Sequence, residues 1–135
     1  MDLGLQDKAV IVTGDFNCGE QSPAVRFLRG EIASAVDPES PVPAAPQWTG
    51  LTDAYVQTHP AEPPESSAAG TFHGFRGTPD GRRIDYVLVA PARRGRVAAR
   101  FPTAEVRTAS IDRSNDNGRW PSDHFPVVAT VRFMD

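Results

Sequence analysis

The sequence has little of what several classes of protein require. It contains one cysteine, Cys18, so no internal disulfide can form and a structural zinc site lacks its thiolates. No apolar run approaches the ~20 residues that a membrane-spanning helix needs, and no secretory signal peptide opens the chain. The net charge of -3 provides no general attraction to nucleic acid, so any phosphate binding has to come from a local group of residues. Localisation stays open, because a targeting segment would lie upstream of Met1.

Length and composition are those of a single folded domain. The chain has 135 residues, 39% of them hydrophobic and 23% charged, which are globular values. It shows no internal repeat and no composition change that marks a second domain. We therefore treat residues 1–135 as one domain.

The first ordered stretch is an apolar, β-branched run over residues 9–13 that ends at Gly14. A continuous run of this kind predicts a strand that is buried on both faces. Asp15 and Asn17 follow it, at a strand end where ligand sites are commonly built. Gly, Asp and Asn also favour turns, so a simple turn is the alternative.

A helix is predicted next, with Ser22 as its N-cap and Pro23 in its first position. Apolar residues recur at helical spacing beyond it, and Asp37-Pro38 predicts its end. A proline-rich link leads to a short ordered element over residues 51–55. There Asp53 is expected at a helix end or turn rather than as a ligand.

Residues 58–70 are rich in Pro, Ser and Ala and predict a loop. In residues 70–75 aromatic residues alternate with small or polar ones, and the glycines permit tight backbone geometry near a ligand. His73 lies between two of these aromatics. Substrate contact and simple packing both remain open for it.

Residues 83–89 alternate in the register of a strand, with Asp85, Val87 and Val89 on one face. Asp85 is therefore a carboxylate among aliphatic neighbours, which is costly unless the charge is paired. Histidine is the natural partner, and the chain has only three. We expect Asp85 to pair with His124.

The remaining segments complete the expected fold. An arginine-containing turn at 91–95 is expected to be solvated surface, and residues 97–108 predict an edge strand that includes Pro102. Residues 111–119 are polar and predict a loop over the site. Residues 125–133 have strong β character and predict the closing strand.

The polar residues at these strand ends suit the hydrolysis of a phosphate ester. Asp15, Asn17 and Asp123 supply oxygens of the kind that Mg²⁺ prefers, with Mn²⁺ as the alternative ion. His124 suits a base or a hydrogen-bond donor to phosphate, with its tautomer fixed by Asp85. The site is thus expected to combine a metal with an in-line attack by water.

Covalent chemistry fits the sequence less well. Cys18 has no adjacent histidine to activate it. Ser122 is close to His124 in sequence but lacks the glycine-framed elbow of a serine nucleophile. We therefore favour water as the nucleophile.

Three motifs together resemble the endonuclease/exonuclease/phosphatase superfamily, the DNase I-like group of magnesium-dependent enzymes. They are Gly14-Asp15-Phe16-Asn17, Arg83-Ile84-Asp85-Tyr86 and Ser122-Asp123-His124-Phe125-Pro126-Val127, in the family's order and at similar intervals. A fourth stretch, Thr71-Phe72-His73-Gly74-Phe75, is similar to one in bacterial members without an assigned substrate. The resemblance extends from about Val10 to Phe133.

The resemblance implies a role for each matching residue. Asp15 would orient or activate the attacking water, and Asp85 would orient His124. His124 would contact the scissile phosphate or act as base. Asp123, together with Asp15, would lie at the metal, and Asn17 would act in catalysis by holding the phosphate. His73 and Arg83 are expected beside them as further substrate-binding residues.

The implied fold is α/β, a four-layer sandwich of two mixed sheets with helices outside. The family's first half, with its metal-ligating glutamate, has no counterpart here, so the chain resembles a C-terminal half with one mixed sheet and flanking helices. A truncated enzyme, one piece of a split enzyme, and a noncatalytic binding or assembly module all fit this pattern. The missing half or a second copy is then an expected partner, because one sheet alone exposes an apolar face.

The substrate class stays open at the level of sequence. Nucleic acid, a phospholipid headgroup and a small phosphate ester all suit such a catalytic centre. The acidic balance of the chain argues mildly against tight binding to a duplex.

Overall fold

The computed structural model describes residues 9–41, 50–90 and 103–134. The elements in chain order are β1 (Ile11–Asp15), α1 (Pro23–Leu28), β2 (Thr52–Asp53), α2 (Ala54–Thr58), the short 3-10 helix η2 (Ser67–Ala69), β3 (Asp85–Val89), β4 (Thr103–Ile111) and β5 (Val127–Met134). None of the helices in these ranges has the length or apolar character to cross a bilayer. The chain is of the α/β class, as expected from its sequence.

Within the described residues the strands form two antiparallel sheets rather than the single mixed sheet that was predicted. β1, β3 and β2 make one sheet in the order β1-β3-β2, and β4 pairs with β5 in the other. A shift of register between Val106 and Thr108 interrupts the β4–β5 ladder. The sequence did not reveal this, because the alternation of residues within a strand indicates which faces are buried but not whether the neighbouring strand runs parallel or antiparallel.

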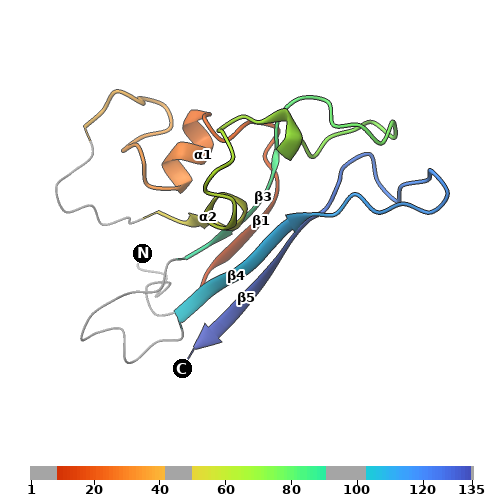
Figure 1. Ribbon diagram of the computed structural model, residues 1–135. Helices are drawn as coiled ribbons and strands as arrows, with labels where there is room; N and C mark the ends of the chain where they lie inside the picture. The colour runs from red at the N-terminus through yellow and green to blue at the C-terminus, as the bar shows by residue number, and fades with distance from the viewer. Residues whose placement is uncertain (1–8, 42–49, 91–102, 135) are drawn as a thin grey trace.

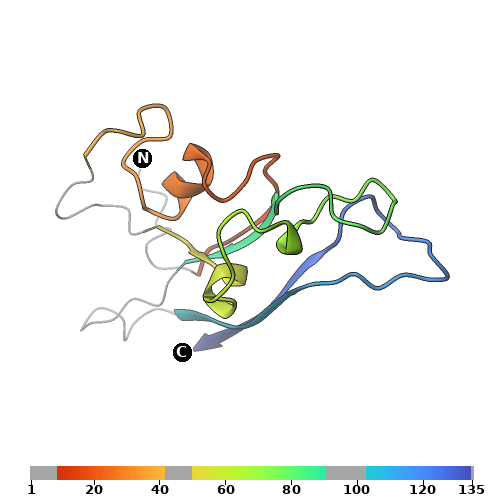
Figure 2. The same cartoon turned by 45° about the horizontal axis from the view of Figure 1, so that its top comes forward.

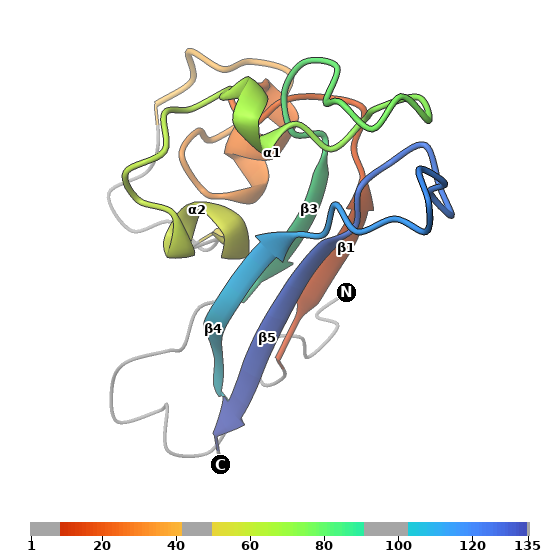
Figure 3. The ribbon, with the colours of Figure 1, turned by 45° about the vertical axis from the view of Figure 1, so that its right-hand side comes forward.

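The three-stranded sheet lies between α1 and the β4–β5 hairpin (Figures 1 and 3). One face of β3 gives Tyr86 and Leu88 to a core with Val25 of α1. The opposite face of β3 gives Val87 and Val89 to a second core, which includes the following residues of the hairpin and α2: Ala104, Val106, Ala109 and Ala54. The alternation predicted for residues 83–89 is thus confirmed, and both faces of β3 are covered.

β1 is not buried on both faces, although its apolar run predicted this. Ile11 is 41% exposed, and Thr13, Gly14 and Asp15 are also exposed. Among the described residues, the core beneath the hairpin takes Val87 and Val89 from β3 but nothing from Ile11–Asp15. An apolar run fits a buried strand, but burial also needs a covering element, and the hairpin does not extend over β1.

α1 begins where the sequence predicted and ends nine residues earlier than Asp37. Ser22 caps it by accepting a hydrogen bond from the Val25 N–H, and Pro23 occupies the first turn. The helix stops at Leu28 because Gly30 takes a left-handed conformation with φ of 73°. Gly50 packs directly against the backbone of Arg29 there, and a side chain on Gly50 would overlap it.

The later segments follow the predictions more closely. Asp53 is the N-cap of α2, and residues 59–66 form a loop that leads into η2. The loop predicted for 111–119 is present within residues 112–126, and the closing strand is β5. The turn at 91–95 and the first part of the strand predicted over 97–108 lie outside the described residues; β4 itself runs from Thr103 to Ile111.

Two loops extend together beyond the strands on one side of the molecule (Figures 1 and 2). They are residues 70–82 and 112–126, joined by a β-bridge between Phe72 and His124. Gly77 of the first loop, with φ of 73°, lies so close to the Trp120 ring of the second that a Cβ would overlap it. The ends of β1 and β3 meet the base of these loops, and this is where the polar residues gather.

Candidate active site

Asp15 and Asp85 face each other across two neighbouring strands. Asp15 is the last residue of β1 and Asp85 is the first of β3, and the antiparallel register pairs them directly. Like charges directly opposite each other destabilise a strand pair. The arrangement therefore calls for a positive group beside both carboxylates.

His124 supplies that group from the loop before β5. Its Nδ1 lies 2.8 Å from Oδ2 of Asp85, and its Nε2 lies 4.0 Å from Oδ2 of Asp15. A carboxylate accepts hydrogen bonds, so Nδ1 carries the proton in this pair and Nε2 is the atom turned toward Asp15. The predicted pairing of Asp85 with His124 is confirmed.

The surroundings of His124 favour its protonated form. The hydrogen bond to Asp85 raises the pKa of the imidazole, and the charges of Asp85, Asp15 and Asp123 add to this. Partial burial lowers the pKa but does not reverse the shift. The imidazolium is thus stabilised between the two facing carboxylates.

The same three residues form a group that suits a metal ion. Ligand atoms of Asp15, Asp85 and His124 all lie within 4.8 Å of one another. Two carboxylates and an imidazole suit Mn²⁺, whereas Mg²⁺ prefers oxygen and would draw on the carboxylates. One oxygen of Asp85 already accepts from His124, so Asp15 and the other oxygen of Asp85 are the donors that remain for a hard cation.

Asp123, predicted as a metal ligand, is not part of this group. Its backbone carbonyl accepts hydrogen bonds from the N–H groups of His73 and Gly74, at 2.9 and 3.1 Å. Its carboxylate lies 3.5 Å from the Ser122 hydroxyl. Asp123 acts on the site through its charge, which raises the pKa of His124.

Asn17 contributes to the site through its backbone. Its N–H donates to Oδ1 of Asp15 at 2.8 Å, in a turn where Asn17 has a φ of 52°. Asparagine tolerates this left-handed conformation better than most residues. The turn fixes the Asp15 carboxylate, and the exposed Asn17 side chain stays adjacent to it.

His73 is packed rather than available to a substrate. It is completely buried, and its ring stacks on Phe125 with ring centres 4.0 Å apart. Its Nδ1 accepts from the Gly77 N–H, at 3.3 Å, so the proton of the neutral ring lies on Nε2. The structure thus favours the packing alternative over the predicted substrate contact.

Arg83 likewise makes its contacts away from Asp15, Asp85 and His124, against its predicted role in substrate binding. Its side chain is 4% exposed, and its guanidinium donates to Asp53 at 2.7 Å and to Glu20 at 3.4 Å. It also lies over the rings of Tyr86 and Tyr55. These contacts hold α2 to the sheet, and sequence alone could not reveal them because both acids are distant in the chain.

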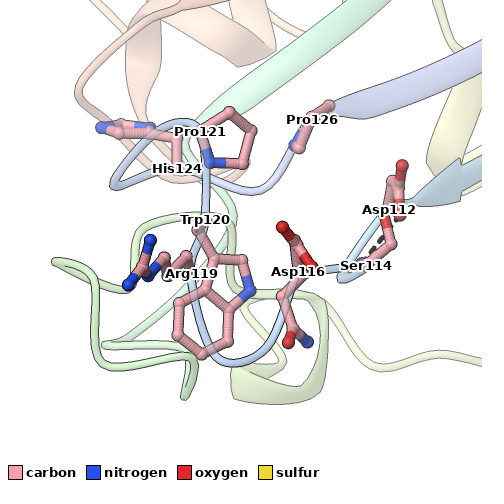
Figure 4. Close-up of a pocket in the computed structure, with 9 residues that line it drawn as sticks. Asp112, Ser114, Asp116, Arg119, Trp120, Pro121, His124 and Pro126 are labelled. Carbon is pink, nitrogen blue, oxygen red and sulfur yellow. Dashed lines mark hydrogen bonds between the residues drawn. The ribbon is translucent and has the colours of Figure 1, made fainter.

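A cavity of about 400 Å³ adjoins His124, and the sequence did not indicate it (Figure 4). Its wall comes mainly from the 112–126 loop: Asp112, Ser114, Asn115, Asp116, Arg119, Trp120, Pro121, His124 and Pro126. The Trp120 indole N–H is buried without a hydrogen-bond partner within the described residues. Proline and tryptophan give this cavity an apolar lining beside charged groups, which is typical of a ligand pocket.

Comparison with protein families places the chain in one family. A sequence description of the endonuclease/exonuclease/phosphatase family matches residues 2–124. The chain belongs to this family. Members of the endonuclease/exonuclease/phosphatase family hydrolyse phosphoesters and generally depend on divalent metal ions.

A solved structure confirms the fold. The crystal structure of an endonuclease/exonuclease/phosphatase from Bacteroides vulgatus is similar to this chain with a TM-score of 0.63 and 20% identity. The similarity covers 99% of this chain and 40% of the Bacteroides protein, so the chain spans less than half the length of that relative. No curated protein matches the chain.

Proposed function

We propose that this chain carries the water-activating and phosphate-binding part of a divalent-metal-dependent phosphoester hydrolase. The observation that supports this is the position of His124, bonded to Asp85 through Nδ1 and turned toward Asp15 through Nε2. An imidazolium and a carboxylate next to each other can act on one reacting phosphate, the first on a phosphate oxygen and the second on the attacking water. Membership of the endonuclease/exonuclease/phosphatase family supports the same reaction class.

The hydrogen bond to Asp85, which raises the pKa of His124, favours the donor role over the role of base. A protonated imidazole cannot accept a proton from water, but its Nε2–H can donate to a non-bridging phosphate oxygen and stabilise the charge that develops there. Asp15 then remains as the group that orients the water and accepts its proton. The water oxygen forms a bond to phosphorus, the bond to the ester oxygen breaks, and that oxygen takes a proton from solvent.

Asp15 and Asp85 are the residues that would hold the metal ion, Mg²⁺ or Mn²⁺. When bound, such an ion supplies positive charge that polarises the phosphate. The Asn17 turn fixes Asp15 for either task, because its N–H engages only Oδ1 and leaves Oδ2 toward His124. The cavity beside His124 provides space for the rest of the ester.

Hydrolysis of bis-p-nitrophenyl phosphate with Mg²⁺, with Mn²⁺ and with chelator tests the proposal. We expect metal-dependent turnover that falls by on the order of 100-fold or more in Asp15→Ala and His124→Ala, since each removes a group that acts on the reacting phosphate. Asp37→Ala is the matched control, because Asp37 is an exposed acid in the loop after α1. Turnover that survives both site variants would overturn the assignment.

A metal titration followed by NMR separates catalysis from binding alone. Shifted signals of Asp15 and Asp85 on addition of Mg²⁺, or broadened signals on addition of Mn²⁺, together with turnover, support the hydrolase. Metal binding at the same residues without turnover would instead support the noncatalytic binding module. If neither metal binding nor turnover occurs, the proposed function is wrong.

A further inference from the structure

The segment Thr71–Gly74 is hydrogen-bonded to the backbone at both members of the Asp85–His124 pair. It runs beside His124, to which Phe72 is joined by an antiparallel β-bridge. The Phe72 ring also meets the His124 ring edge-on, with centres 5.2 Å apart. Thr71 has no exposed surface at all. A buried threonine at this position has to satisfy its hydroxyl within the protein.

On one side, the backbone of this segment holds the residues before and after His124. The Phe125 N–H donates to the Thr71 carbonyl at 2.7 Å. The N–H groups of His73 and Gly74 donate to the Asp123 carbonyl at 2.9 and 3.1 Å. These are main-chain bonds, so any residue at these positions could make them.

On the other side, the Thr71 side chain holds the start of β3. Its Oγ1 accepts hydrogen bonds from the N–H groups of Ile84 and Asp85, at 3.1 and 3.3 Å. These two bonds require a hydroxyl acceptor at residue 71. Serine would preserve them and valine would abolish them, although valine has nearly the same shape as threonine.

Thr71 therefore bonds to Asp85 and to the residue after His124 through different atoms. Its carbonyl fixes the backbone next to His124, and its hydroxyl fixes the backbone of Asp85 itself. Asp85 begins β3 and His124 lies in the loop before β5, 39 positions further along the chain, so their pairing depends on contacts that hold these two segments in place.

We propose that Thr71 is a positioning residue that sets the geometry of the Asp85–His124 hydrogen bond. It touches neither a substrate nor the imidazole ring. Loss of its hydroxyl frees the Asp85 backbone to shift, and a small shift is enough to break a hydrogen bond whose strength falls steeply with distance and angle. The inference rests on this geometry and not on the hydrolase activity.

The Nδ1 proton of His124 reports the pair directly. A proton held in a hydrogen bond to a carboxylate gives a protected resonance far downfield in a low-temperature NMR spectrum, and loss of the signal in His124→Gln assigns it. We expect the wild-type protein and Thr71→Ser to retain the resonance and Thr71→Val to lose it. Thr58→Val is the matched control, because the Thr58 hydroxyl bonds only within and next to α2, and it should retain the resonance.

Two further variants separate positioning from general stability. Val25→Ala removes buried volume from the core beneath α1 and should lower stability while the resonance remains. Thr71→Ala removes the hydroxyl without placing a methyl group against the two N–H groups, and it replaces Thr71→Val if that variant does not fold. A retained resonance in Thr71→Val, or in Thr71→Ala where it is the folded variant, would overturn the proposal. A resonance that disappears equally in Val25→Ala would also overturn it.

Discussion

Two carboxylates that face each other explain most of what His124 does in this protein. Asp15 and Asp85 are direct partners across β1 and β3, and like charges directly opposite each other destabilise a strand pair. A protonated imidazole between them offsets this repulsion. The strand register thus places both carboxylates beside His124, and both carboxylates raise its pKa.

Replacing Asp85 by asparagine should lower the pKa of His124. The hydrogen bond to Asp85 is the largest cause of the raised pKa, and an amide oxygen stabilises the imidazolium less than a carboxylate does. The pKa should fall toward the ordinary value of about 6.5, as followed by an NMR titration of the ring protons. Asp37→Asn, which changes an exposed acid in the loop after α1, should leave the pKa of His124 unchanged.

The same variant should change stability in a pH-dependent way. Because the folded-state pKa of His124 is raised, its pairing stabilises the folded protein fully below the unfolded pKa of about 6.5 and is lost as pH rises through the folded pKa. The difference in free energy of unfolding between wild type and Asp85→Asn is therefore expected to be largest on the acid side and to shrink above the folded pKa. Urea unfolding at a series of pH values measures it, and a difference that grows with pH would contradict the charge assignment.

At the level of single residues, the sequence could predict a contact where few residues of the required type are available. An acid in an apolar strand and only three histidines leave few possible pairs, so Asp85 with His124 could be predicted. The packing of His73 was one of two alternatives, but its partner could not be predicted, because the ring of Phe125 that covers it comes from the other loop. Asp123 shows a different difficulty. Its carboxylate side chain suggested a metal ligand, whereas its backbone carbonyl makes the hydrogen bonds to His73 and Gly74.

Among the elements, the short helix α2 depends on a single carboxylate with two tasks. Oδ1 of Asp53 accepts from the N–H groups of Tyr55 and Val56 and so caps the helix. Oδ2 of Asp53 accepts from the buried guanidinium of Arg83 at 2.7 Å. The cap and the ion pair together fix α2 against β3.

Asparagine at position 53 should separate these two tasks. It retains an oxygen that can cap α2, but it places an amide where Arg83 needs an acceptor. Because Glu20 still contacts Arg83, we expect a loss near the lower end for a broken buried pair, about 3 kcal/mol in the free energy of unfolding by urea. Asp53→Ala should cost about 1 kcal/mol more, because the cap is lost as well.

The Arg76–Asp80 pair is the matched control for this prediction. Its nitrogen and oxygen are 2.8 Å apart, nearly the same as in the buried pair, but the two side chains are 59% and 64% exposed. Asp80→Asn should therefore change the free energy of unfolding by less than about 1 kcal/mol. Equal effects of Asp53→Asn and Asp80→Asn would show that burial does not decide the strength of these pairs.

Element starts could be predicted from the sequence more easily than element ends. Ser22 and Pro23 act locally, so the start of α1 follows from its own residues. The end of α1 lies just before Gly30, where Gly50 from a distant segment packs on Arg29, so the helix end cannot be judged from local residues alone. In the same way, β1 had the composition of a buried strand, but whether another element covers it is decided elsewhere in the chain.

On the scale of the whole molecule, the two cores share one strand. Leu88 of β3 belongs to the core beneath α1, and its neighbour Val89 belongs to the core beneath the β4–β5 hairpin. β3 is therefore the layer on which the helices and the hairpin both rest. The antiparallel pairing of β3 with β1 then brings Asp15 to Asp85.

Leu88→Ala should destabilise the protein far more than Val128→Ala. Leu88 is fully buried, and its loss leaves a cavity that typically costs about 2–5 kcal/mol in the free energy of unfolding. Val128 of β5 is 49% exposed, so we expect its replacement to cost less than about 1 kcal/mol. Thermal or urea unfolding of the two variants compares them, and similar losses would mean that β3 is not the centre of the fold.

The direct pairing of Asp15 with Asp85 also has a consequence for the order in which the protein is made. A ribosome releases β1 and β3 before the segment with His124, which follows Asp85 by 39 positions. In such a nascent chain the two carboxylates would face each other without an imidazolium, so the strand pair is weaker than in the finished protein. The pair reaches its full stability only after His124 has emerged from the ribosome.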